Sequence, residues 1–494
     1  MKFKVKNLNI KSGGPLITVI DKHDASLMDL KPIDRIRIKH GKKSIIAVMD
    51  ISEEHGNIKD GQIGMFQEVI ERLNVKNNKI VDVEFVGRPK SIDCIRKKLD
   101  GKELSLNEID VIIKDLIENR LTETELTYFV SGAYTHGLSD KETYYLTKAI
   151  VDNGRRLEIK RKIILDKHSI GGISGNRTTM IIVPIIAAAG FTIAKTSSRA
   201  ISSAAGTADA MECLAKVDLS IEELRKVVRK TNACIAWAGT IDLASADDTL
   251  IKIRNPLRLD PEGMLLASIM AKKVAVGSTN VLIDIPLGKE AKVKNVNEAR
   301  RLKSKFEKLG KMFKIKVKVI LTNGSQPIGN GVGPNLEARD VLYVLTRDKR
   351  APKDLEEKAV KMAGILLEMI NVKDSENFAK FILNSGLAYN KMKEIIKAQG
   401  GNPNVKVNDL KVGRFKYDVK SGRTGIVKDV DNDLINKIAR IAGAPVDKDA
   451  GIYLNKHQGD KVKRKEVLFT IYSRNKERLK DAMLMLNKNI VKIR

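Results

Sequence analysis

The chain has 494 residues, of which 43% are hydrophobic, 31% are charged and 4% are aromatic, and its formal net charge is +29. This length exceeds what a single hydrophobic core fills, so we expect about three domains and enough chain for a deep cleft. The longest apolar run, 180–189, is shorter than the ~20 residues of a membrane-spanning helix and contains Pro184. The first segment also lacks the apolar core of a signal peptide, so the composition excludes membrane and secreted classes and predicts a cytoplasmic protein.

The basic charge raises the question of a nucleic-acid partner. Lysines are interspersed with glutamates and aspartates along the whole chain, aromatic residues are few, and no RRM, zinc-finger or helix-turn-helix signature is present. We therefore expect no nucleic-acid partner and interpret the charge as a basic surface that concentrates small anionic substrates. The three cysteines have no CxxC spacing, and the histidines of residues 1–88 are widely spaced, so we expect reduced thiols and neither a metal nor a cofactor.

Residues 1–88 have the alternating pattern of β-strands and predict a β-rich N-terminal domain with a hairpin that turns at His40-Gly41. From 89 to 160 the period becomes helical, and we expect a lobe of three or four short helices. Tyr128 is expected to pack in the core of this lobe. Three sequences match the capping boxes that begin helices: Ser105–Glu108, Thr122–Glu125 and Ser139–Glu142.

Residues 161–404 alternate between β-branched runs and amphipathic segments, which is typical of an α/β lobe. After the Gly400-Gly401 turn the β alternation returns, so 405–494 is predicted to be an α+β C-terminal domain. The predicted fold class is therefore α/β with α+β additions. Within the lobe we expect strands at 162–165, 191–195, 233–237, 281–285 and 316–322, and helices that include 297–312, 354–370 and 377–397.

The stretch 166–207 has the features of a phosphate-binding site. A predicted strand ends at 167–169 (Lys-His-Ser) and is followed by Gly171-Gly172 and a helix that begins near Asn176. Glycines admit an anion close to backbone N–H groups, the helix N-terminus adds partial positive charge, and the lysine adds a full one. A second loop, 196–207, is rich in hydroxyls and contains Arg199. Glycine turns are common in α/β proteins, but two such loops favour phosphate, and neither is a Walker A or GxGxxG motif.

The second informative stretch is 260–263 (Asp-Pro-Glu-Gly). It predicts a helix through Lys273 with Asp260 as N-cap and proline at the first helical position. Ser268 and Lys272 are four residues apart and share one face of that helix. The residues themselves leave open whether Asp260 only caps the helix or also takes part in chemistry.

Four motifs, in this order, resemble those of the thymidine/pyrimidine-nucleoside phosphorylase family. They are Lys167-His-Ser-x-Gly-Gly172, Ser197-x-Arg199 followed by Gly206-Thr207, Ser268-Ile-Met-x-Lys272-Lys273, and Gln326-Pro-x-Gly329 leading to Glu337. The resemblance covers roughly residues 90–490 and is greatest to the branch that has an additional N-terminal domain and acts on nucleoside 5′-monophosphates. It implies a small helical lobe, 89–160 joined by about 245–275, that faces the α/β lobe across a cleft, with phosphate on the larger lobe.

The resemblance also implies roles for individual residues. Phosphate-binding positions of the family match Lys167, Ser169, Thr179, Ser197 and Thr207. Nucleotide-binding positions match Gly172, Ser198, Arg199, Ala200, Ile201, Ser202, Ser203, Thr207, Ser268 and Lys292, and Asp260 is implied as the proton donor. The chain departs from nucleoside phosphorylases at 200–205, where they have glycines and a histidine, and at 253–255, where they have Leu-Arg-Asp. Both departures disfavour thymidine as substrate.

The implied reaction is phosphorolysis of AMP to adenine and ribose 1,5-bisphosphate, with CMP and UMP as further substrates, in a homodimer or larger homo-oligomer. Phosphate is itself the nucleophile, so the chemistry needs a cationic, hydroxyl-lined cradle and a proton for the leaving base. A 5′-phosphate needs a cradle of its own, for which 198–203 and Lys292 are the candidates. The sequence leaves open a thymidine or pyrimidine-nucleoside phosphorylase, an anthranilate-type phosphoribosyltransferase and a basic RNA-binding protein.

Overall fold

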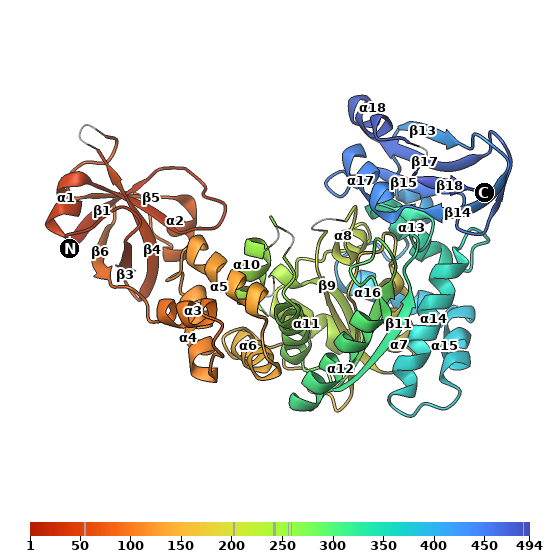
Figure 1. Cartoon of the computed structure of the whole chain (residues 1–494), viewed down its shortest axis with the longest axis horizontal. Helices are drawn as coiled ribbons and strands as arrows, with labels where there is room; N and C mark the ends of the chain where they lie inside the picture. The colour runs from red at the N-terminus through yellow and green to blue at the C-terminus, as the bar shows by residue number, and fades with distance from the viewer. Residues whose placement is uncertain (54–55, 201–202, 241–243, 255, 258, 488) are drawn as a thin grey trace. The chain divides into compact units, whose positions relative to one another are not determined.

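The computed structural model describes residues 1–494 except 54–55, 201–202, 241–243, 255, 258 and 488. The chain forms two compact units, Met1–Gly154 with Ala244–Ser268, and Arg155–Leu243 with Ile269–Arg494. Figure 1 shows the elements of each unit. In the described part of the chain, no helix is both long and apolar enough to cross a membrane.

The N-terminal residues form a closed β-barrel, coloured red in Figure 1, with the strand order β1-β5-β2-β4-β3-β6. Alternate side chains of its strands point inward, so that Phe3, Ile36 and Met49 are completely buried in the barrel core. The predicted hairpin is confirmed, because β3 and β4 pair antiparallel with His40 opposite Lys43. The barrel elements are β1 (Lys2–Asn7), β2 (Ile17–Asp21), α1 (Lys22–Leu27), β3 (Arg35–His40), β4 (Lys43–Ser52), β5 (Gln62–Met65), α2 (Gln67–Leu73) and β6 (Ile80–Val86).

Helices make up the rest of the first unit: α3 (Ser91–Leu99), α4 (Leu106–Ile117), α5 (Glu123–His136), α6 (Asp140–Asp152) and α10 (Ser245–Arg254). All three predicted capping boxes are present, at the starts of α4, α5 and α6. The prediction for Tyr128 is wrong, because this residue is 54% exposed. The buried residues of α5 include Leu126, Phe129 and Val130, and the helical period places Tyr128 on the opposite face.

The second unit is built on a five-stranded parallel sheet with the order β11-β10-β7-β8-β9. Its strands are β7 (Ile164–Ser169), β8 (Thr192–Ser197), β9 (Ala233–Trp237), β10 (Asn280–Leu287) and β11 (Lys316–Asn323), with helices α7 (Thr178–Ala188), α8 (Thr207–Glu212), α9 (Ile221–Thr231) and α12 (Val296–Met312) between them. The alternation of strands and helices confirms the predicted α/β class. The strand order reverses direction between β7 and β10, and open α/β sheets bind ligands at the carboxyl ends of the strands at such a point.

Four further helices pack on α7, whose residues 178–187 are all buried. They are α13 (Pro334–Leu345), α14 (Lys353–Glu368), α15 (Ser375–Asn384) and α16 (Leu387–Ala398). The single helix predicted at 377–397 is therefore wrong, because the chain has two helices that are separated at Ser385-Gly386. Gly386 has a φ of +80°, a left-handed conformation that glycine adopts without penalty and that ends helices.

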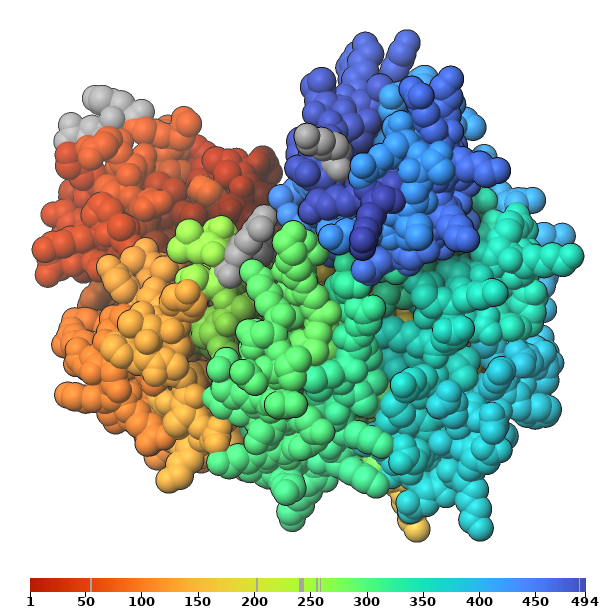
Figure 2. Space-filling model, turned by 45° about the vertical axis from the view of Figure 1, so that its right-hand side comes forward, coloured from red at the N-terminus to blue at the C-terminus, as the bar shows by residue number. Residues whose placement is uncertain are grey.

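The C-terminal residues form an α+β domain within the second unit. Two sheets, β12-β15-β17-β13 and β16-β14-β18, accompany α17 (Asn432–Ala442) and α18 (Lys476–Leu484). Strand β12 precedes α13 and pairs with β15, and Ala204 contributes to the hydrophobic core of the domain. In Figure 2 the blue C-terminal residues lie directly on the teal part of the lobe, so the domain covers loops that follow β8 and β11. The strands are β12 (Gly331–Val332), β13 (Phe415–Lys420), β14 (Gly425–Val430), β15 (Gly451–Leu454), β16 (Lys461–Val462), β17 (Val467–Ser473) and β18 (Val491–Ile493).

Candidate active site

Three of the predicted phosphate-binding residues, Lys167, Ser169 and Ser197, lie at the carboxyl ends of β7 and β8, and the other two, Thr179 and Thr207, lie at the starts of α7 and α8. These strands are parallel neighbours with Leu165 opposite Ile193, so Ser169 and Ser197, each four residues further on, end at the same edge of the sheet. On the other side of β7, Asp284 of β10 lies opposite Ser169. The edge is therefore where the strand order reverses, as expected for a ligand site in this kind of sheet.

Lys167 is a buried lysine at this edge, only 2% exposed. Its Nζ donates to Oγ1 of Thr178, the first residue of α7, over 3.0 Å. Burial lowers the pKa of Lys167 to about 8, an effect that Asp284 opposes and that the nearby cations Lys358 and Arg177 reinforce. The positive charge is thus poorly compensated, and a bound anion would stabilise it.

Two more buried lysines lie close to Lys167. Lys273 forms an ion pair of 2.8 Å with Asp166, and both side chains are almost completely buried. Lys195 on β8 donates to the carbonyl of Thr196, and burial together with the charge of Lys273 holds the pKa of Lys195 well below its usual value. This part of the lobe therefore contains more lysines than its carboxylates neutralise.

Asp284 organises the other side of the edge, and no sequence motif pointed to this residue. Its carboxylate accepts hydrogen bonds from Ser169 Oγ at 3.0 Å and Thr322 Oγ1 at 2.6 Å, and Lys358 Nζ lies 3.2 Å away. Burial would raise the pKa of Asp284, but Lys167 and Lys358 lower it overall, so the carboxylate stays charged. Ser169 donates its proton to Asp284 in this structure, and its predicted contact with phosphate stays a prediction.

Two buried hydroxyls on β8, Thr196 Oγ1 and Ser197 Oγ, have no hydrogen-bond partner among the described residues. Buried polar groups are nearly always paired, so an unpaired group at a sheet edge indicates a place for water or a ligand. Ser197 is one of the predicted phosphate-binding residues. Thr179, another of them, lies buried in the first turn of α7, while the neighbouring Thr178 is the residue that contacts Lys167.

The structure brings the predicted nucleotide-binding residues Gly172 and Lys292 together. Gly172 has a φ of +91°, and a Cβ added to it would lie 2.6 Å from the backbone nitrogen of Lys292. Only glycine therefore allows this approach of the two segments. Both residues are exposed, so they are accessible to a ligand.

Arg199 is bound to carboxylates. Its guanidinium forms two hydrogen bonds with Glu212, of 2.6 and 3.0 Å, contacts Asp218 at 3.2 Å and Asp209 at 3.4 Å, and lies 4.8 Å above the ring of Trp237. These contacts raise the pKa of Arg199 and make it an anchor for the loop after β8. A contact of its guanidinium with the nucleotide stays a prediction.

The backbone of the same loop is held by Asp209, whose Oδ2 accepts the N–H groups of Ala200 and Gly206, each at 2.7 Å. Ser198 is exposed and Ser203 is partly buried, with its Oγ donating to the carbonyl of Ala205 at 3.0 Å. Ile201 and Ser202 lie outside the described residues, so the structure carries no information on these two predicted contacts.

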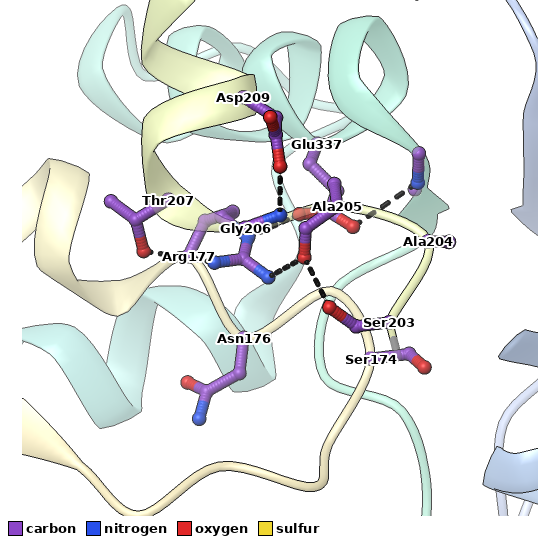
Figure 3. Close-up of polar contacts among 12 residues, drawn as sticks. Ser174, Asn176, Arg177, Ser203, Ala204, Ala205, Gly206, Thr207, Asp209 and Glu337 are labelled. Atoms are coloured by element: carbon purple, nitrogen blue, oxygen red, sulfur yellow. Dashed lines mark hydrogen bonds and ion pairs between the residues drawn. The ribbon is translucent and has the colours of Figure 1, made fainter. Parts of the chain in front are cut away.

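Arg177 connects the two loops (Figure 3). From the loop after β7 it donates to Oγ1 of Thr207 at 2.9 Å and to the carbonyl of Ala205 at 3.0 Å, and its Nε donates to Glu337 on α13. Glu337 also accepts the N–H of Gly333, the residue just before α13, at 3.1 Å. Sequence reasoning missed Arg177 because its partners are far away in the chain, although Glu337 ended one of the recognised motifs.

Helix α17 of the C-terminal domain also holds both loops. Asn432 accepts the N–H of Ser174 at 2.8 Å and donates to the carbonyl of Gly172 at 2.7 Å, and Asn436, one turn later, accepts the N–H of Ala204 at 2.6 Å. The spacing of four residues that puts both asparagines on one helix face is visible in the sequence. Their target is not, because it depends on how the domain packs.

Two predicted site residues belong to the first unit. Ser268 Oγ donates to Asp247 at 2.7 Å, and both side chains are buried. Asp260 is exposed, and helix α11 (Glu262–Val276) begins two residues after it, one position later than predicted. The other predicted residues that the structure describes belong to the second unit.

One group of potential metal ligands comes together among the described residues, in the barrel: His23, Asp24 and Asp60, with ligand atoms within 4.8 Å of one another. His23 Nδ1 and Asp60 Oδ1 are 3.2 Å apart, both side chains are about two-thirds exposed, and Asp60 raises the pKa of His23. His23 and Asp60 thus satisfy each other as an exposed acid–imidazole pair, while the buried Asp24 accepts the N–H of Gly61 at 2.7 Å.

Three family models match consecutive parts of the chain. They are the helical bundle domain of a glycosyl transferase family at residues 92–154, the a/b domain of a glycosyl transferase family at 161–388, and the pyrimidine nucleoside phosphorylase C-terminal domain at 426–492.

Curated relatives span nearly the whole chain. The AMP phosphorylase of Pyrococcus furiosus is 45% identical, over 98% of this chain and 96% of its own, and that of Thermofilum pendens is 42% identical, over 97% and 92%. The AMP phosphorylase of Methanocaldococcus jannaschii is 42% identical, over 98% and 95%.

Solved structures share the fold at low identity. Anthranilate phosphoribosyltransferase from Thermus thermophilus superposes with a TM-score of 0.51 at 17% identity, over 63% of this chain and 100% of its own. The Saccharomyces cerevisiae enzyme superposes with a TM-score of 0.50 at 16% identity, over 63% and 98%. At this identity the likeness concerns the fold alone.

Proposed function

Because the chain belongs to the AMP phosphorylase family, we propose that it cleaves AMP with inorganic phosphate to give adenine and ribose 1,5-bisphosphate. The names of relatives at 42–45% identity over nearly the full length support this activity. The structural observation that carries it is the undercompensated Lys167, whose pKa is lowered to about 8, beside the unpaired hydroxyl of Ser197 at the carboxyl edge of the sheet. A phosphate dianion supplies both the negative charge and the hydrogen-bond acceptors that these groups lack.

The proposed chemistry uses phosphate as the nucleophile and the protein as its cradle. Lys167 neutralises the anion, Thr179 and Ser197 supply hydroxyl donors, and the buried N-terminus of α7 adds the partial charge of its dipole. Ser169 joins these donors when its proton turns from Asp284 to the anion. Held in this way, phosphate attacks the anomeric carbon as the bond to the base breaks, so that the transition state gains from orientation and charge stabilisation. Asp260 then gives its proton to the leaving adenine.

The nucleotide cradle of the proposal is the surface formed by Gly172 and Lys292 together with the loop after β8. Its support is the contact between Gly172 and the backbone of Lys292, the anchoring of the Arg199 side chain, and Asp209, which holds the backbone at Ala200 and Gly206. The 5′-phosphate is proposed to bind the Lys292 ammonium and the hydroxyls of this loop. The base is proposed to bind Ser268. Because the 5′-phosphate is remote from the reacting bond, its binding energy serves orientation and therefore catalysis.

The deciding experiment is chromatography of free adenine released from AMP by the full chain, with and without phosphate. We expect adenine release that depends on phosphate and continues in the presence of EDTA. Adenosine and thymidine are run in parallel, since the nucleoside phosphorylase alternative predicts that they react better than AMP. No adenine release with phosphate, combined with tight RNA binding that falls steeply with salt, would instead establish the RNA-binding alternative.

The proposal extends to CMP and UMP as further substrates, to a homodimer or larger homo-oligomer, and to a cytoplasmic location. Competition by CMP and UMP in the adenine assay, light scattering of the purified chain, and cell fractionation test these three points. The unpaired state of Cys94, Cys213 and Cys234 is consistent with a reducing compartment.

A further inference from the structure

Arg177 has none of the roles that the resemblance assigned, yet it is the residue that joins the two loops of the site. It is 8% exposed and uses three of its N–H groups on partners of different kinds: a hydroxyl, a backbone carbonyl and a carboxylate. In Figure 3 its side chain lies between Thr207, Ala205 and Glu337. A planar guanidinium with donors in a fixed fork holds such a set in one geometry.

The direction of the bond to Thr207 matters for the ligand. Arg177 has only donors, so the Thr207 oxygen must be the acceptor of this 2.9 Å bond. A hydroxyl oxygen that accepts a hydrogen bond from a fixed cation can still donate its own proton to a second group in another direction. Thr207 is partly exposed, and among the described residues its proton has no acceptor. An anionic ligand is the partner that such a proton suits.

Glu337 holds the guanidinium in place. It is 1% exposed, pairs with Arg177 Nε and accepts the N–H of Gly333, so its position is set by the start of α13. Burial raises the pKa of Glu337, and the Arg177 charge opposes that shift. The ion pair therefore ties α13 to the loop after β7, and the remaining donors of Arg177 reach Thr207 and Ala205 after β8.

We propose that Arg177, held by Glu337, is a positioning residue that turns the Thr207 hydroxyl toward the phosphate group of the substrate and fixes the 203–207 backbone around it. The proposal rests on the proposed function for the identity of that substrate. It predicts that the contribution of Arg177 to substrate binding and turnover depends on the presence of the Thr207 hydroxyl.

A double-mutant cycle tests this dependence. Removing Arg177 alone would leave a buried carboxylate unpaired and threaten folding, so the change is made as the pair Arg177→Met with Glu337→Gln. The second change is Thr207→Val, which keeps the branched shape and removes the hydroxyl. The paired change, Thr207→Val and their combination are compared with the parent for kcat/KM toward AMP and for phosphate affinity by calorimetry. The paired change also removes the bond from Arg177 to the Ala205 carbonyl, and it does so whether or not the Thr207 hydroxyl is present. The cost of that bond therefore cancels in the cycle, and the coupling energy reports the interaction of Arg177 with the Thr207 hydroxyl.

We expect the paired change and Thr207→Val each to lower kcat/KM by about 10- to 100-fold, mainly through KM. The combination should fall less than about threefold below the worse of the two, because both remove one function. Losses that multiply would overturn the proposal. An Arg177→Lys variant should have a lower kcat/KM than the parent, since one ammonium cannot hold three partners. A lysine variant with the parental kcat/KM would also contradict the proposal.

Two further measurements separate the possible failures. The pair Lys98→Met with Glu142→Gln is the matched control, because these two side chains are buried like Arg177 and Glu337 and form an ion pair of 2.9 Å in the helical part of the first unit. It should leave kcat/KM within about twofold, and an equal loss there would mean that any buried charge change has this effect. If the parent releases no adenine, the proposed function fails, and the calorimetric cycle with phosphate then decides: coupled losses support the positioning role and independent losses refute it.

Discussion

Replacing Lys167 by methionine is expected to make the protein more stable and nearly inactive. The lowered pKa measures how unfavourable the buried charge is: a shift from 10.5 to about 8 corresponds to roughly 3 kcal/mol. Methionine removes this penalty and also the 3.0 Å bond to Thr178, whose loss costs about 1 kcal/mol. Asp284 keeps Lys358, Ser169 and Thr322 as partners. The net expectation is a gain of about 2 kcal/mol in the free energy of unfolding at neutral pH.

The sign of the pH dependence follows from the order of the two pKa values. In the folded protein the pKa of Lys167 is about 8, below the 10.5 of an ordinary lysine, so the folded state binds the proton less well than the unfolded state. The penalty is complete below pH 8, declines between pH 8 and 10.5, and is absent above that range. The stability advantage of the methionine variant should therefore be larger at pH 7 than at pH 10.

Calorimetric melting of the full chain in phosphate-free buffer at pH 7 and pH 10 measures this difference. Loss of a charge-assisted donor should at the same time lower phosphate-dependent kcat/KM by about 30- to 1,000-fold. Lys162→Met changes an exposed lysine just ahead of β7 and should alter neither property. A Lys167→Met variant that melts earlier at pH 7 and still consumes phosphate at the parental rate would refute the reasoning.

Three further predictions concern the nucleotide side. Asp260→Asn should lower kcat about 100- to 10,000-fold with an unchanged melting temperature if Asp260 is the proton donor. Normal turnover of the variant would show that Asp260 has no part in the chemistry. AMP should have a kcat/KM at least about 100-fold above that of adenosine, and equal values would exclude a 5′-phosphate cradle. Gly172→Ala should raise the KM for AMP about tenfold or more, because its Cβ would lie 2.6 Å from the Lys292 nitrogen. Gly171→Ala is its control, since Gly171 has a similar φ of +93° but open space, and equal effects would assign the loss to backbone strain alone.

Local chemistry made part of this protein predictable. The three capping boxes need residues only three apart, so their hydroxyls and carboxylates find the same backbone N–H groups wherever the helix lies. The alternation of strands and helices indicated the α/β class, and the β3–β4 hairpin followed from a turn between two alternating runs. The strand, glycine turn and helix around Lys167 were predictable for the same reason, since the three are contiguous in the chain.

The tertiary structure alone decided which groups meet. Arg177 and Glu337 are 160 residues apart, and Asn432 reaches Gly172 across 260, so no local pattern could pair them. Asp284 became part of the site because β10 pairs with β7 in the register that places it opposite Ser169. Arg199, a nucleotide ligand by motif, is turned toward Glu212 and Asp218, whose positions depend on the helix after its loop. The sequence determined the chemical character of the two loops, but strand order and domain packing determined the charges around them, because a buried charge responds to every neighbour within a few ångströms regardless of its place in the chain.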